Sequence, residues 1–346
     1  MKKLLFILFP LGLFAQVATF SDDTLKLKYA NSISIDDLQA HINILASDSL
    51  EGRETGKTGQ KMAANYIANF FKEIGIPPYK HNSYFQKFKV KTVKRYGRWK
   101  WDKNSVFEKM LNNNYIKGEN IIGFIEGSDL KHEIIIITAH YDHLGVKDTL
   151  IYNGADDNGS GTVAVMEIAQ AFMLAKKEGN GPRRSVLIMP VSGEEKGLLG
   201  SKYYTENPVY PLENTVANLN VDMIGRIDDY HDNPDYIYLI GSDRLSTELH
   251  QISEEVNDKY INLELDYKYN DKDDPNRYYY RLDHYNFAKN NIPVIFYFNG
   301  VHTDYHKASD TVEKIHFPKI EKISRYIFLT AWELANREER PKLDVN

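Results

Sequence analysis

Metal-binding residue types stand at five places where a predicted strand meets a loop. They are His140, Asp157, Glu195, Asp222 and His306. Two histidines and three carboxylates can bind two adjacent zinc-type ions. Because an unpaired buried carboxylate is costly, several such groups at the ends of apolar runs indicate that positive charge lies among them. The sequence therefore predicts a two-metal site.

The first of these places follows the apolar run 134–138. A strand there would deliver His140 to its carboxyl end, where open α/β sheets hold their sites, and Asp142 can point to the same side. A metal-bound imidazole needs its other ring nitrogen held, often by a carboxylate. Taken alone, a surface histidine beside a solvated aspartate explains this pair equally well.

Adjacent acids mark the second place, where Asp156 and Asp157 lie among small residues. Small residues let the backbone pass close to a ligand, and one aspartate there could bridge two cations with its two oxygens. An Asx turn that caps the next helix is the alternative. Neighbouring carboxylates repel each other, and a bound metal would offset that cost.

A second acidic pair, Glu194 and Glu195, follows the apolar run 186–191. A hydrolytic metal site needs one carboxylate as ligand and another, free one to take a proton from water. A solvated acidic helix start is the alternative, since acids favour that end of a helix. Asp222 and His306 each add modest support, and all five positions together are unlikely to be accidental.

The elements that must position these residues alternate between strand and helix signals, which predicts an α/β fold with a mostly parallel central sheet and helices on both faces. Continuous apolar runs predict buried strands at 121–125, 134–138, 186–191, 216–221, 237–240 and 294–298. Ser34 with Asp37 forms a capping box, and Thr58 is expected to cap a second helix that stops at Gly75. Further helices are expected near 160–177, 198–206, 244–260, 283–290 and 320–334. Two segments, 91–118 and 266–281, are expected to be surface excursions.

The composition is that of an ordinary globular protein, with 42% hydrophobic residues and a net charge of -5. Without a basic surplus, a nucleic acid is not an expected partner. Lys2 and Lys3 precede the apolar run 4–14 and then Ala15. That run is too short to span a bilayer, so residues 1–15 are interpreted as a cleaved signal peptide of an exported, periplasmic or extracellular protein with no membrane association afterwards.

With these motifs, the chain resembles the M28 family of zinc metallopeptidases, which includes bacterial leucyl aminopeptidases and aminopeptidases of the S or Y type. The resemblance extends from Leu45-Ala-Ser-Asp-Ser-Leu-Glu-Gly-Arg-Glu-Thr-Gly56 to Asp310-Thr311. It implies a zinc-exopeptidase fold, of the phosphorylase/hydrolase-like kind, in a single catalytic domain over 20–340. The space between Gly75 and Ile121, about 45 residues, is too short for an inserted protease-associated domain.

The resemblance also implies a role for each site residue. His140 and Asp222 would hold one of two Zn²⁺ ions, Glu195 and His306 the other, with Asp157 bridging and a cis peptide after it. The catalytic residues would be Glu194 as general base, Asp142 as the partner that orients His140, and Tyr305 as a donor to the oxyanion.

The predicted function is that of an exported dizinc aminopeptidase acting on peptides with a free N-terminus. A glutaminyl cyclase-like acyltransferase with one zinc, lacking the first histidine, is one alternative. A binding module on the same fold without catalysis is another. His143 and His302 are expected to be bystanders or substrate-pocket residues, and Leu282 stands where the family often has serine. The run Tyr278 to Tyr280 could line a pocket or pack against the sheet.

Overall fold

A central sheet of seven strands organises the molecule, as the computed structural model of residues 22–80, 82–91 and 115–344 shows. The predicted signal peptide and most of the segment 91–118 lie outside these residues. The strands of the sheet are β3 (Gly123–Ile125), β4 (Leu130–His140), β7 (Arg184–Val191), β8 (Thr215–Val221), β9 (Tyr236–Ile240), β10 (Glu264–Asp266) and β11 (Val294–Phe298).

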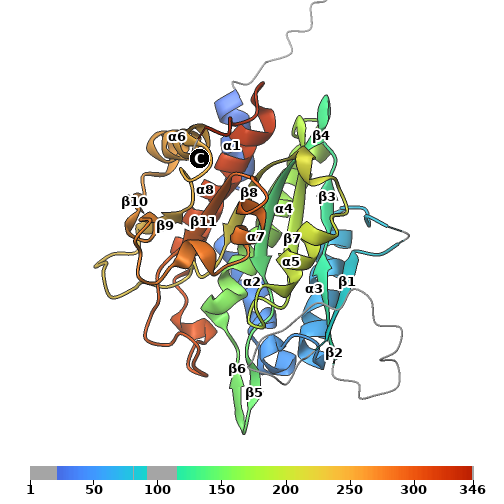
Figure 1. Ribbon diagram of the computed structural model, residues 1–346, viewed down its shortest axis with the longest axis vertical. Helices are drawn as coiled ribbons and strands as arrows, with labels where there is room; N and C mark the ends of the chain where they lie inside the picture. Colours follow the sequence, from blue (N-terminus) through green and yellow to red (C-terminus); the bar gives the residue numbers. More distant parts are fainter. Residues whose placement is uncertain (1–21, 81, 92–114, 345–346) are drawn as a thin grey trace, which may run out of the picture.

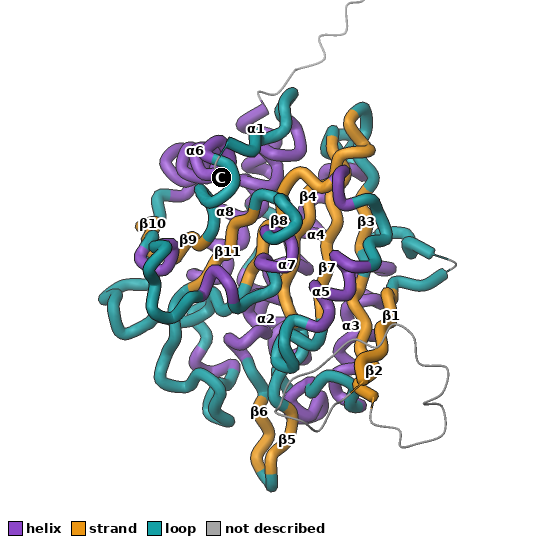
Figure 2. The backbone as a smooth tube through the Cα atoms, in the orientation of Figure 1, coloured by secondary structure: helices purple, strands orange, loops and turns teal. Residues whose placement is uncertain are grey.

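The strand order is β10-β9-β11-β8-β4-β7-β3 (Figures 1 and 2). Four pairings are parallel, and β11 with β9 and β3 with β7 are antiparallel. The predicted α/β class with a mostly parallel sheet is therefore confirmed. The central strands β4, β7 and β8 are buried along most of their length, which explains why they read as unbroken apolar runs.

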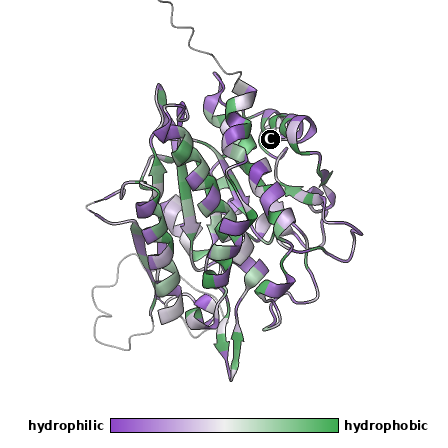
Figure 3. Ribbon diagram, turned by 180° about the vertical axis from the view of Figure 1, so that it is seen from behind, coloured by the Kyte–Doolittle hydropathy of each residue, from purple (hydrophilic) through white to green (hydrophobic). Residues whose placement is uncertain are grey.

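Helices cover both faces of this sheet. One face carries α4 (Gly161–Lys177) and α8 (Phe317–Asn336), against which α1 (Asp22–Ala30), α2 (Ile35–Leu45), α3 (Thr58–Glu73) and α6 (Thr247–Val256) pack. The other face carries α5 (Leu199–Glu206) and α7 (His284–Ala288), which lie in front of the sheet in Figure 1. The two largest apolar cores among the described residues lie one on each face, and Figure 3 shows the apolar strands between the helices.

Side-chain caps predicted from the sequence are present at one helix start and absent at another. The Ser34 hydroxyl accepts the backbone N–H of Asp37, so the predicted capping box is present. The prediction that Thr58 caps α3 is wrong, because Thr58 is the first helical residue and Lys57 precedes it without a side-chain cap. No helix among the described residues combines the length and the apolar character needed to cross a bilayer.

Other elements carry no strong sequence pattern. They are α1, the antiparallel ribbon of β1 (Phe85–Lys91) with β2 (Tyr115–Ile121), and the hairpin of β5 (Gly145–Lys147) with β6 (Leu150–Tyr152). The predicted strand 121–125 is divided, since Ile121 ends β2 and Gly123 begins β3. The division follows from the partners, because β2 pairs with β1 and β3 pairs with β7.

The carboxyl ends of β4, β7, β8 and β11 bring their loops to one edge of the sheet, on the side of the β5–β6 hairpin (Figure 1). β4, β7, β8 and β11 run in the same direction, so the residues that follow them meet there. All five predicted ligands lie at this edge.

Candidate metal centre

Two groups of histidine and carboxylate side chains meet at this edge. His140 is the last residue of β4, and Asp222 directly follows β8. His140 Nε2 lies 3.3 Å from Asp157 Oδ1 and 3.3 Å from Asp222 Oδ1. All three side chains are buried. These three residues are referred to below as the first cluster.

The second cluster is formed on the other oxygen of Asp157. Its Oδ2 lies 3.2 Å from His306 Nε2, which is 3.5 Å from Glu195 Oε1. His143 Nδ1 lies 3.0 Å from the same Glu195 oxygen and 3.7 Å from Asp157 Oδ2. Asp157 therefore stands between the two clusters and presents one oxygen to each, which is the arrangement a bridging ligand requires.

Divalent metal ions fit these clusters. Nitrogen and oxygen ligands of a tetrahedral zinc ion lie about 3.3 to 3.6 Å from one another, given the usual bond lengths. The two separations in the first cluster are 3.3 Å, and those in the second cluster extend from 3.0 to 3.7 Å around this range. Asp157 Oδ2, Glu195 Oε1 and Asp222 Oδ1 are also buried without a hydrogen-bond donor among the described residues. Buried anionic oxygens that lack donors call for a cation.

The two histidines expected to be bystanders or substrate-pocket residues differ in their positions. His302 lies 3.2 Å from Asp156 Oδ2 and does not reach either cluster. His143 contradicts the expectation, because it lies inside the second cluster. His143 stands in the polar segment Asp142-His143-Leu144 and not at the end of an apolar run. Its position beside Glu195 therefore depends on the tertiary fold, and no local pattern predicts it.

Asp142 connects His140 to Glu194. His140 Nδ1 lies 3.0 Å from the carbonyl oxygen of Asp142 and 3.8 Å from its carboxylate, so the carbonyl is the nearer acceptor. The carboxylate accepts the backbone N–H of Glu194 at 3.3 Å and the hydroxyl of Thr55. The contact expected between the Asp142 side chain and His140 is therefore looser than a hydrogen bond.

Asp157 is held in place through its backbone. Asp310 Oδ2 accepts the N–H groups of Asp156 at 3.0 Å and of Asp157 at 3.1 Å. The peptide bond between Asp157 and Asn158 is cis, as the resemblance implied. The Asp156 side chain faces away from the clusters, where its Oδ1 accepts the N–H of Gly225. The adjacent acids thus have separate tasks, and only Asp157 faces the metal clusters.

Arg53 holds the loops that follow β4 and β6 in place through hydrogen bonds to their backbone. The sequence did not identify it as a site residue. Arg53 is 1% exposed, and its guanidinium group donates to the carbonyl oxygens of Tyr141, Asn153 and Gly154 at 2.6–2.9 Å. It also donates to Leu45. Burial lowers the pKa of Arg53 to about 10, and the acids of the site oppose that shift. Its positive charge lies beneath the acidic clusters.

Burial also shifts the carboxyl groups of the site. It raises the pKa of Asp222 to about 6. Burial, with the charge of Glu195 adding to it, holds the pKa of Glu194 well above its usual range. A cation bound in the clusters would favour the ionised forms of the carboxyl groups that contact it. Glu194 belongs to neither cluster, and its raised pKa suits a group that accepts and releases a proton.

A cavity of about 270 Å³ opens onto both clusters. Glu194 and Tyr305 line it together with the apolar side chains of Leu282, Phe298 and Val301. Tyr305 stacks on His306 with ring centroids 3.9 Å apart, and burial raises its pKa, so its hydroxyl stays protonated.

The tyrosine run contributes one residue to this cavity. Tyr278 lines it, Tyr279 packs in the core, and Tyr280 is exposed.

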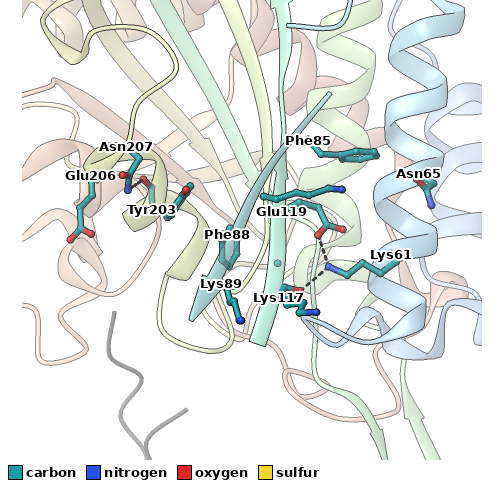
Figure 4. Close-up of a pocket in the computed structure, with 12 residues that line it drawn as sticks. Lys61, Asn65, Phe85, Phe88, Lys89, Lys117, Glu119, Tyr203, Glu206 and Asn207 are labelled. Atoms are coloured by element: carbon teal, nitrogen blue, oxygen red, sulfur yellow. Dashed lines mark hydrogen bonds and ion pairs between the residues drawn. The ribbon is translucent and has the colours of Figure 1, made fainter. Parts of the chain in front are cut away.

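A larger cavity of about 690 Å³ lies on the β1–β2 ribbon, away from the clusters (Figure 4). No histidine is among the described residues that line it, and its buried acid, Glu119, is paired with Lys61. It offers neither a set of metal ligands nor a free buried base, so the smaller cavity is the candidate site.

Comparisons with known proteins agree with this geometry. Over 109 residues, 31% of this chain and 22% of the relative, the chain is 33% identical to aminopeptidase YwaD of Bacillus subtilis. Over 114 residues, 32% of this chain and 25% of the relative, it is 32% identical to a probable zinc metalloprotease of Leptosphaeria maculans. The chain thus spans about a quarter of the length of these curated relatives.

The fold is also known from solved structures. The LapA aminopeptidase of Legionella pneumophila superimposes with a TM-score of 0.69 at 22% identity, over 98% of this chain and 81% of the other. Residues 120–331, more than half of the chain, match the sequence profile of Peptidase family M28. The match contains most of α8 and all five predicted ligands, His140, Asp157, Glu195, Asp222 and His306. The chain therefore belongs to peptidase family M28.

Proposed function

We propose that the protein is an exported dizinc aminopeptidase that removes N-terminal residues from peptides. The observation that carries the proposal is the position of Asp157 between the two clusters. Its Oδ1 faces His140 and Asp222, and its Oδ2 faces Glu195 and His306. Glu194 lines the same cavity and belongs to neither cluster.

His140, Asp157 and Asp222 would hold one zinc ion, and Asp157, Glu195 and His306 the other. Bound there, the two ions would lower the pKa of water and polarise the scissile carbonyl. Glu194 accepts the proton of the attacking water and returns it to the leaving amine, because its raised pKa suits both steps. The protonated Tyr305 hydroxyl donates to the oxygen on which negative charge develops.

The cavity also supports the choice of substrate. Its volume of about 270 Å³ suits one residue rather than a folded chain. The apolar wall of Leu282, Phe298 and Val301 would take an apolar N-terminal side chain, and the carboxylates opposite would attract the free α-ammonium group. Export is supported by the N-terminal signal pattern, Lys2 and Lys3 before the apolar run 4–14.

A glutaminyl cyclase-like acyltransferase is the second candidate that the sequence left open. It would need only one zinc ion, whereas here His140, Asp157 and Asp222 form a first cluster beside the second. A binding module without catalysis would not need Glu194 beside a full set of ligands.

The experiment that tests the proposal combines metal content with hydrolysis. The purified protein should hold two zinc equivalents and cleave Leu- or Ala-p-nitroanilide. Glu194→Gln should keep both zinc ions while turnover falls about 100- to 10,000-fold. Cyclisation of N-terminal glutamine by a protein with one zinc would favour the second candidate, and turnover near wild type in Glu194→Gln would remove Glu194 from its role.

A further inference from the structure

We propose that His143 is a fourth protein ligand of the ion held by Asp157, Glu195 and His306. This inference rests on the proposed two-metal function and adds a residue that the family resemblance did not assign. The first cluster would then supply three protein ligands and the second four.

The distances place His143 where a ligand belongs. His143 Nδ1 lies 3.0 Å from Glu195 Oε1 and 3.7 Å from Asp157 Oδ2, the same two oxygens that His306 approaches at 3.5 and 3.2 Å. Both histidines therefore approach the same pair of carboxylate oxygens.

The His143 ring has no other partner that would explain its position. Its side chain is fully buried, and neither ring nitrogen has a hydrogen-bond partner among the described residues. The close approach to Glu195 thus lacks the geometry of a hydrogen bond. A buried imidazole without a donor or acceptor is costly. A cation near Glu195 Oε1 and Asp157 Oδ2 would satisfy Nδ1 and both oxygens together.

The surrounding backbone is shaped to admit this ring. Gly154 has φ +55°, and a Cβ atom there would lie 2.5 Å from the His143 ring and 2.1 Å from the carbonyl oxygen of Asp157. On the other side, the His143 backbone N–H donates to the carbonyl oxygen of Arg53 at 3.3 Å. The ring is thus confined between Gly154 and the second cluster.

The difference in ligand number would divide the work of the two ions, because one could bind water or the scissile carbonyl directly and the other would act on them through its charge. A zinc site with four protein ligands is closed, whereas a site with three keeps a position for water or substrate. The open position would belong to the cluster of His140 and Asp222. The ion of the second cluster, held by two histidines, should be the one retained when zinc is removed stepwise.

The test measures zinc retention by the full-length protein in buffers of defined free zinc, for the wild type, His143→Ala and the control His284→Ala. His284 is also fully buried, stacks on Phe296 and forms no ion pair among the described residues. We expect two equivalents in the wild type and control, and a loss of affinity for one equivalent in His143→Ala on the order of 100-fold. Retention of both equivalents with wild-type affinity in His143→Ala would overturn the proposal.

Two further measurements keep the outcomes separate. Melting temperatures in the presence of EDTA show whether apo His143→Ala is folded, and zinc should raise its melting temperature less than that of the wild type. In a crystal structure of the zinc-loaded wild type, Nδ1 of His143 should lie about 2.0–2.1 Å from the ion, and a separation above about 3 Å would refute ligation. A wild type that binds no zinc would instead refute the proposed function itself.

Discussion

The carboxylate of Asp142 accepts the backbone N–H of Glu194 at 3.3 Å. Asp142, the second residue after β4, therefore holds the start of the loop that carries the proposed base, Glu194. The other carboxylate oxygen accepts the hydroxyl of Thr55. Both oxygens are occupied, and the side chain is fully buried.

Asp142→Asn should lower turnover about 10- to 100-fold while two zinc ions remain bound. An amide has one acceptor oxygen for two donors, so either Thr55 or Glu194 loses its partner. Steady-state kinetics with Leu-p-nitroanilide and zinc analysis of the same sample check this. Unchanged turnover would show that the contact with Glu194 does not position the base.

Replacing Leu282 tests the apolar wall of the cavity. Leu282→Ala should lower kcat/KM for an N-terminal leucine substrate about 10-fold and affect an alanine substrate less, because the larger side chain loses its contact. A panel of aminoacyl-p-nitroanilides measures the ratio. An equal loss for both substrates would place Leu282 outside the pocket for the N-terminal side chain.

Arg53→Met should destabilise the fold by about 3 to 5 kcal/mol, because the carbonyl oxygens of Tyr141, Asn153 and Gly154 lose a buried donor. Urea denaturation with EDTA present removes the metal contribution. The control is Arg281→Met, since Arg281 is exposed. Equal stability of the two variants would contradict the supporting role of Arg53.

The buried Lys319 side chain should make the free energy of unfolding depend on pH. It is 2% exposed, donates to the carbonyl oxygens of Pro234 and Tyr236, and burial lowers its pKa from 10.5 to about 7. Between these values the unfolded chain binds a proton that the folded chain does not, so stability rises with pH. Below about pH 7 both forms are charged, and the full cost of burying the charge applies.

Lys319→Met should remove this part of the slope, which is at most about 1.4 kcal/mol per pH unit. Urea denaturation between pH 7 and pH 10, compared between wild type and variant, isolates it from other titrating groups. If the free energy of unfolding changed equally with pH in the wild type and in Lys319→Met, Lys319 would not titrate in this range.

The sequence predicted the strands that end in ligands because each is a local apolar run with a polar residue after it. His140 and Asp222 are found this way, and their convergence follows from parallel strands sharing an edge. The division of 121–125 could not be predicted, because it depends on pairing with β1 and β7 rather than on the run itself.

His143 and Arg53 were missed for a different reason. A histidine or arginine in a polar segment has the same local pattern whether it faces solvent or a buried cluster. The contact between the His143 backbone and Arg53 joins segments 90 positions apart, and no periodicity reports it. Gly154, which makes room for the ring, is likewise recognisable only from its backbone angle and neighbours.

The central claim is that His140, Asp157, Glu195, Asp222 and His306 hold a pair of cations. Anomalous diffraction from zinc-loaded crystals tests it most directly. The account predicts two peaks about 3.5 to 4 Å apart, one beside each carboxylate oxygen of Asp157. No peak there, or a single peak on one side of Asp157 at saturating zinc, would contradict it.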